Sequence, residues 1–153
     1  MSRLKKVLLV ILIVFIGIQL IQPARNNSGQ ELSTDISKTI SIPSNVGALL
    51  KTACYDCHSN NTNYPWYAKI QPGGWWLASH IQNGKKELNF SEFGAYSSRR
   101  QQSKLKSISS QLEDGEMPLA SYAFLHKNAR LTKEQKELII DWALQTRDKL
   151  EKQ

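Results

Sequence analysis

Two cysteines and the histidine beside them constrain this chain more than any other feature of its sequence. Cys54 and Cys57 are its only cysteines, so no disulfide framework can hold the fold together. They lie three residues apart and His58 follows at once, which gives the pattern C-x-x-C-H. This pattern is the attachment signature of c-type haem. Two thiols at this spacing reach the two vinyl groups of a porphyrin, and the adjacent imidazole reaches the iron as its proximal ligand. The sequence therefore predicts one covalently attached haem.

Closely spaced cysteines also occur in two other kinds of site. A redox-active C-x-x-C pair of the thioredoxin type normally lies in a βαβ unit, and this sequence shows no pattern of such a unit. A zinc site would have to recruit His58, His80 or His126, but none of these histidines is near another in sequence, whereas a structural zinc site normally has its two histidines closely spaced. A dithiol and a zinc site stay open as alternatives, and c-type haem is the interpretation favoured.

A six-coordinate haem iron needs a second axial ligand, and Met117 is the best candidate. It is the only methionine besides the initiator, and it lies in the loop sequence Gly-Glu-Met-Pro at 115–118. The following proline biases Met117 toward an extended backbone, which helps to hold the thioether on the open haem face. The alternative role of Met117 is simply to fill space in the core. His80 is the alternative sixth ligand, although a histidine beside tryptophans on a helix is more often part of the packing. His126 is a weaker candidate.

The first 22 residues differ from the rest of the chain. Arg3, Lys5 and Lys6 precede an uncharged run from Val7 to Ile21, a pattern typical of membrane targeting. The run is slightly shorter than the ~17 to 25 residues that span a bilayer, and a cleaved signal peptide is the alternative. Because no small-x-small cleavage site follows, we expect an uncleaved N-terminal transmembrane helix. The charge asymmetry then predicts a single-pass protein of the cytoplasmic membrane, with the remaining residues on the periplasmic, extracytoplasmic side.

The rest of the chain divides into a polar linker over residues 23–43 and a haem-binding domain over residues 44–153. Helical spacing of apolar residues predicts helices over residues 44–53, 75–86 with an end near Gly84, and 98–113. A capping box of Thr132 and Gln135 opens a last helix, whose predicted apolar face includes Leu138 and Ile139. Since no stretch alternates apolar and polar residues over a useful length, the predicted fold is all-α.

Aromatic residues are dense just after the haem motif. Their number and position suggest that they line a porphyrin pocket, and an ordinary core cluster is the alternative. They are Tyr64, Trp66, Tyr67, Trp75 and Trp76.

The net charge of +7 makes nucleic-acid binding a function to consider. The predicted topology argues against it, because it places the domain outside the cytoplasm. Residues 85–106 contain six cations and two anions. A solvated helix face is the simplest interpretation of this basic segment. An acidic protein partner and an anionic lipid are the alternatives.

A longer pattern extends the haem signature. The motif C-x-x-C-H-S is followed by Trp75-Trp76, His80, Leu88-Asn89-Phe90-Ser91, Gly115-Glu116-Met117-Pro118, Tyr122, His126 and Trp142. In this order the residues resemble the small haem-binding domain family of bacterial cytochrome c-type proteins over about residues 43–148. The resemblance implies a cytochrome c-like helical domain wrapped around its haem, and it implies haem binding more strongly than any reaction.

Two classes of function follow from a single haem motif. One is a membrane-anchored monohaem c-type cytochrome that exchanges electrons with redox protein partners through an iron ligated by His58 and Met117. The other is a haem enzyme of the peroxidase type, or a ligand sensor, with an open or displaceable sixth position. Because cytochrome peroxidases usually need two haem motifs, the sequence favours the electron carrier.

Overall fold

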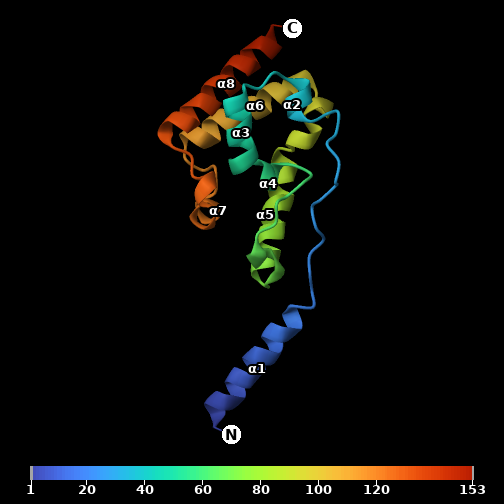
Figure 1. Cartoon of the computed structure of the whole chain (residues 1–153), viewed down its shortest axis with the longest axis vertical. Helices are drawn as coiled ribbons and strands as arrows, with labels where there is room; N and C mark the ends of the chain where they lie inside the picture. The colour runs from blue at the N-terminus through green and yellow to red at the C-terminus, as the bar shows by residue number, and fades with distance from the viewer. Residues whose placement is uncertain (1, 153) are drawn as a thin grey trace.

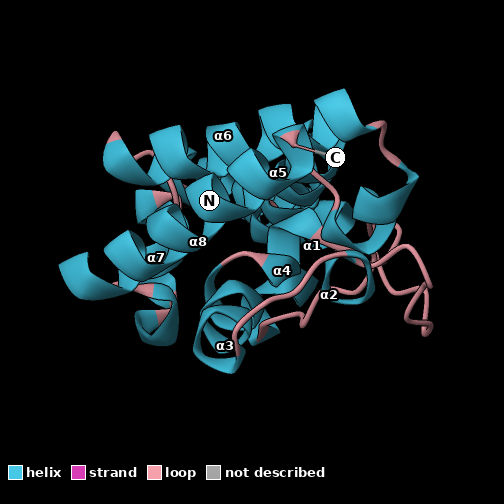
Figure 2. Cartoon of the chain, turned by 90° about the horizontal axis from the view of Figure 1, so that it is seen from above, coloured by secondary structure: helices cyan, strands magenta, loops and turns pink. Residues whose placement is uncertain are grey.

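Every regular element of the chain is a helix in its computed structural model, which describes residues 2–152 (Figure 1). The prediction of an all-α fold is therefore confirmed for this range, where the nearest thing to a strand is an isolated antiparallel bridge between Asn27 and Asn61. Figure 2 shows the helices joined by loops when the molecule is seen from above. The elements are α1 (Arg3–Ile18), α2 (Ile36–Thr39), α3 (Ser44–Ala53), α4 (Tyr55–His58), α5 (Gly73–Glu87), α6 (Ser98–Glu113), α7 (Ala120–Leu125) and α8 (Lys133–Glu151), with 3-10 turns η1 (Trp66–Lys69), η2 (Phe90–Ala95) and η3 (Lys127–Ala129).

The apolar N-terminal run forms α1, which extends away from the other helices in Figure 1. In the described part of the chain, no helix has both the length and the apolar character needed to cross a bilayer. The predicted transmembrane helix is therefore wrong, and so is the single-pass membrane location derived from it. With 16 residues α1 is about 24 Å long, whereas a hydrocarbon core is about 30 Å thick. The helix stops because the next residues bind the domain: Gln71 N donates to the Gln19 side chain at 2.8 Å, and Trp75 Nε1 donates to Ile21 O at 2.8 Å.

Residues 23–43, expected to be a linker, lie against the domain. Asn26 N donates to the Tyr64 hydroxyl at 2.7 Å, and Asn26 Nδ2 donates to Ser59 O at 2.8 Å. Further along, Ile36 at the start of α2 is fully buried in the main core. These contacts fasten the segment to the haem motif on one side and to η2 on the other.

The main core lies where α6 and α8 pack together and α3 joins them. The predicted range of α6 is confirmed, and its Leu105 and Leu112 are buried. The capping box at the start of α8 is also confirmed. The predicted apolar face of α8 is only partly right, because Ile139 is fully buried whereas Leu138 stays 37% exposed. This core holds α3 in place, and α3 leads directly into the candidate site.

Candidate functional site

The C-x-x-C-H motif forms the sharp junction between α3 and α4. Cys54 N donates to Leu50 O at 2.9 Å, which closes α3, and Cys54 O then accepts from Cys57 N at 3.2 Å and His58 N at 3.0 Å. One backbone carbonyl therefore organises the whole turn. Cys54, Cys57 and His58 all line a hollow between α3, α5 and α7, and Cys54 and His58 also line an adjoining hollow that α6 borders.

His58 is fixed by a hydrogen bond from its ring. Its Nδ1 lies 2.9 Å from Leu88 O, and since a carbonyl can only accept, Nδ1 carries the proton. The other nitrogen, Nε2, is then left with a free lone pair. Burial lowers the pKa of His58 below its usual value, which favours the neutral ring. A neutral imidazole whose second nitrogen is held by a carbonyl is the form in which histidine ligates metals.

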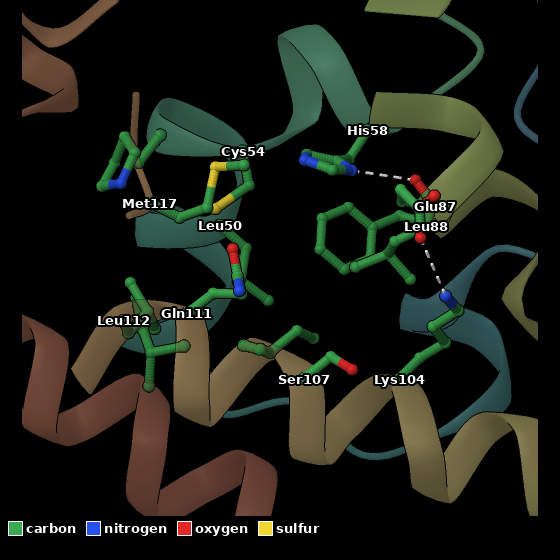
Figure 3. Close-up of a pocket in the computed structure, with 15 residues that line it drawn as sticks. Leu50, Cys54, His58, Glu87, Leu88, Lys104, Ser107, Gln111, Leu112 and Met117 are labelled. Atoms are coloured by element: carbon green, nitrogen blue, oxygen red, sulfur yellow. Dashed lines mark hydrogen bonds and ion pairs between the residues drawn. The ribbon is translucent and has the colours of Figure 1, made fainter. Parts of the chain in front are cut away.

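A cavity of about 370 Å³ opens beside His58, within the ~300 to 1,000 Å³ range of ligand pockets (Figure 3). Cys54, His58 and Met117 line it. Its remaining walls are mainly apolar. They include Leu50 of α3, Leu88 just after α5, Phe90 of η2, Ile108 and Leu112 of α6, and Ile139 of α8. A second cavity of about 260 Å³ adjoins it, sharing Cys54, His58 and Met117 and adding Cys57 and His80. The two hollows form one site around the motif.

The two thiols are held in their protonated form. Burial, together with the neighbouring Cys57, raises the pKa of Cys54 to about 12, and burial with the nearby Asp56 raises the pKa of Cys57 to about 11. A reactive C-x-x-C dithiol needs the opposite shift, toward a thiolate at neutral pH. The structure therefore disfavours a thioredoxin-type redox pair.

The zinc alternative lacks a set of ligands. Within residues 2–152, no three His, Cys, Asp or Glu side chains gather closely enough to hold a metal ion. A structural zinc site needs four such ligands.

Met117 reaches the site through a tight turn after α6. Gly115 takes φ +72°, a left-handed conformation that favours glycine, and so ends the helix. The Gln111 carbonyl then accepts from both Glu116 N at 3.0 Å and Met117 N at 3.1 Å. These bonds turn the chain back toward the cavity. Met117 lines both hollows together with His58.

The other two histidines lie differently. His80 Nδ1 is 2.8 Å from Trp76 O and its ring lies 4.3 Å from that of Trp76, but the residue lines the second hollow. His126 lines neither hollow, since its ring stacks on Tyr122 at 4.0 Å. His80 therefore stays a candidate ligand and His126 does not.

Both spacer residues of the motif make contacts that the sequence analysis missed. The Tyr55 ring stacks on Phe90 at 5.0 Å. The Asp56 carboxylate accepts from the Tyr122 hydroxyl at 2.5 Å and from Asn63 N at 3.0 Å. Burial and this hydrogen bond raise the pKa of Tyr122 well above its usual range. The spacers thus tie the motif to η2 and to α7, just beyond the Met117 loop.

The segment Leu88–Ser91 supports the motif from the other side. Besides the Leu88 carbonyl on His58, buried Asn89 donates through Nδ2 to Asn60 Oδ1 at 2.9 Å. Ser91 Oγ accepts from Asn60 N at 3.1 Å. The segment was noticed in the sequence only as part of the family resemblance, because nothing local to it reveals a contact with His58.

The aromatic cluster does not line the two hollows around His58. Trp66 is 76% exposed, and Tyr64 lies under the guanidinium of Arg25 at 4.3 Å. The hydroxyl of Tyr67 is buried without a hydrogen-bond partner. The expectation that these residues line the pocket is therefore wrong: on α5, Trp75 turns to Ile21 of the N-terminal segment and the Trp76 ring lies against His80.

Gly84 brings α5 close to the motif. The helix ends at Glu87, one residue beyond the predicted range, and Gly84 lies inside its last turn. A Cβ at Gly84 would lie 2.9 Å from Cys57 O, closer than side chains are found. The glycine is thus needed for close packing between helices, where the sequence suggested a helix end.

We therefore expect Gly84→Ala to destabilise the protein by about 1 to 3 kcal/mol, because overpacking must push α5 away from α4. Urea unfolding measures the change. Gly47→Ala on α3 is the matched control, because its new Cβ would meet only Ile42 Cγ2 at 3.7 Å and is expected to be neutral or stabilising. Equal stability of the two variants would contradict the close approach at Gly84.

Burial of His58 also predicts a pH dependence in the haem-free chain. Because the folded state lowers the pKa of His58, it binds fewer protons than the unfolded state between that lowered pKa and about 6.5. Folding stability is therefore highest above pH 6.5 and falls as the pH drops toward the lowered pKa, by at most about 1.4 kcal/mol per pH unit. Urea midpoints measured from pH 8 to pH 5 test this. The slope should be smaller in His58→Gln, and an unchanged slope would assign it to other groups.

Comparison with known proteins gives one match. A family model described as a haem-binding domain matches residues 13–145, most of the chain and all of the candidate ligands. No match was found among curated proteins or among solved structures.

Proposed function

Since the chain belongs to the family of haem-binding domains, with haem as its cofactor, we propose that it is a monohaem c-type cytochrome that carries electrons. One observation carries this proposal. Cys54, His58 and Met117 line the same mainly apolar cavity, although Met117 is far from the other two in sequence. These are the thiol, imidazole and thioether groups that a covalently attached, six-coordinate haem requires.

The residues around the cavity fit such a group. A porphyrin needs apolar walls, and six aliphatic or aromatic side chains from α3, η2, α6, α8 and the residue after α5 provide them. It needs an imidazole with a free nitrogen, which the Leu88 carbonyl secures at His58. It also needs two thiols at the rim, and both cysteines are free.

Cys54 and Cys57 would form the covalent links. Each thiol would add its S–H across one vinyl double bond, so that sulfur would bond to one carbon and hydrogen to the other. The addition needs no external oxidant or reductant. The raised pKa values of both thiols agree with cysteines that stay protonated until this reaction.

His58 and Met117 would serve as axial ligands. When bound, haem supplies an iron that accepts and gives up one electron. Nε2 of His58 would bind the iron, and the Leu88 carbonyl fixes the ring in place for this role. The Met117 thioether approaches from the turn held by the Gln111 carbonyl, and His80 is the alternative ligand. The apolar walls exclude water, and the electron donor and acceptor are other redox proteins.

Optical and electron paramagnetic resonance spectra of the purified, haem-loaded protein test this proposal. A carrier with His58 and Met117 as ligands gives a low-spin ferric haem with a weak thioether charge-transfer band in the red. A high-spin ferric haem that binds small ligands would overturn it in favour of a haem enzyme or sensor, because such a spectrum requires an open sixth position.

A further inference from the structure

Lys104 brings a positive charge to the edge of the apolar cavity. Among the described residues that line the cavity, it is the only cation and Glu87 is the only anion. The Lys104 side chain is 20% exposed, and its Nζ lies 3.6 Å from Glu87 Oε2. The Glu87 side chain is 83% exposed, so this ion pair is long and largely solvated on one side and contributes little stability.

The position of Lys104 relative to the cysteines is informative. Haem carries its vinyl groups on one edge and its two propionates on the opposite edge. Figure 3 shows Cys54 and Met117 on one side of the cavity and Lys104 on the other, with the polar side chain of Gln111 also pointing inward from α6. If Cys54 held the vinyl edge of a porphyrin, Lys104 would be the cation of the cavity wall that is available to a propionate on the far side.

Other cations of the basic segment 85–106 are engaged elsewhere. Lys85 Nζ donates to Asn26 Oδ1 at 2.6 Å, and the guanidinium of Arg100 lies 4.1 Å above the Tyr96 ring. Lys106 is exposed on α6 and does not line the cavity. The basic segment thus contributes Lys104 alone to the cavity wall.

We propose that Lys104, the one cation among the described residues that line the cavity, binds a haem propionate. This inference rests on the proposed covalent haem site. A propionate at the cavity edge would lie beside the Glu87 carboxylate, and two carboxylates at close range repel each other unless a cation lies between them. Lys104 supplies that cation.

The test uses the full chain loaded with haem. In Lys104→Gln, the propionate bending mode in the resonance Raman spectrum shifts, and the reduction potential falls because a cation beside the haem favours the reduced state. Lys104→Arg keeps the charge and retains the potential. Lys106→Gln is the matched control, since it removes the same charge from the same helix at an exposed position, and it leaves the propionate mode unchanged.

The propionate mode in the Raman spectrum tests whether Lys104 contacts the propionate. A propionate mode that is the same in Lys104→Gln and the unmodified protein would overturn the role of Lys104 while leaving the haem site intact. Absence of covalent haem from the unmodified protein would instead overturn the proposed function itself. Comparing the haem content of the two proteins before the spectra are recorded separates these outcomes.

Discussion

Replacing both Cys54 and Cys57 by serine is expected to abolish covalent haem attachment. Serine hydroxyls do not add to the vinyl groups, so both links are lost together. The yield of folded protein should also fall sharply, because the walls of the cavity from α3, α5 and α6 would lose the group they surround. Haem-dependent peroxidase staining of a denaturing gel measures the attachment, since only covalently held haem stays with the chain.

The single variants Cys54→Ser and Cys57→Ser are the controls for this experiment. Each keeps one thiol at the cavity and should retain one link, with weaker staining than the unmodified protein. Full staining in the double variant would contradict the attachment. Such a result would leave haem binding, which the family match supports, without a covalent bond.

Replacing Met117 by alanine is expected to open the sixth coordination position of the iron. The thioether charge-transfer band disappears, the ferric spectrum becomes high-spin or water-ligated, and the reduced protein binds carbon monoxide. The reduction potential also falls, because a thioether favours the reduced iron more than water or imidazole does. The haem itself stays attached, since Cys54, Cys57 and His58 are unchanged. Optical titration with carbon monoxide measures the change.

His80→Ala is the matched control for Met117→Ala. His80 lines the second hollow, but its Nδ1 is bound to Trp76 O, and its removal should leave the thioether band in place. The opposite pattern would make the ligand assignment wrong. If His80→Ala became high-spin while Met117→Ala stayed low-spin, the protein would be a bis-histidine cytochrome of lower potential.

Local signals in the sequence account for much of the fold. The range of α6 could be predicted because Leu105 and Leu112 repeat at helical spacing and Gly115 stops the helix. The end of α1 could not, because it depends on hydrogen bonds from Gln71 and Trp75, more than fifty residues away. An apolar run reveals a helix, but its end here depends on tertiary contacts that the run does not contain.

The candidate site also has some features that the sequence predicts and others that depend on tertiary contacts. The chemistry of Cys54, Cys57 and His58 is local, so their spacing is enough to predict it. The Leu88 carbonyl that orients His58 comes from another element, and the close approach at Gly84 exists only after α5 packs on α4. The aromatic cluster was misplaced for the same reason, since closeness in sequence to the motif does not determine which way a helix turns its side chains.

A mass spectrum of the proteolytic peptide that contains Cys54–His58 tests the central claim most directly. The protein is produced with a haem-attachment system, alkylated under reducing and denaturing conditions, and digested. We predict a peptide that carries one haem and no alkyl group, because both free thiols of the haem-free chain have become thioethers. A peptide with two alkylated cysteines and no haem would contradict the claim.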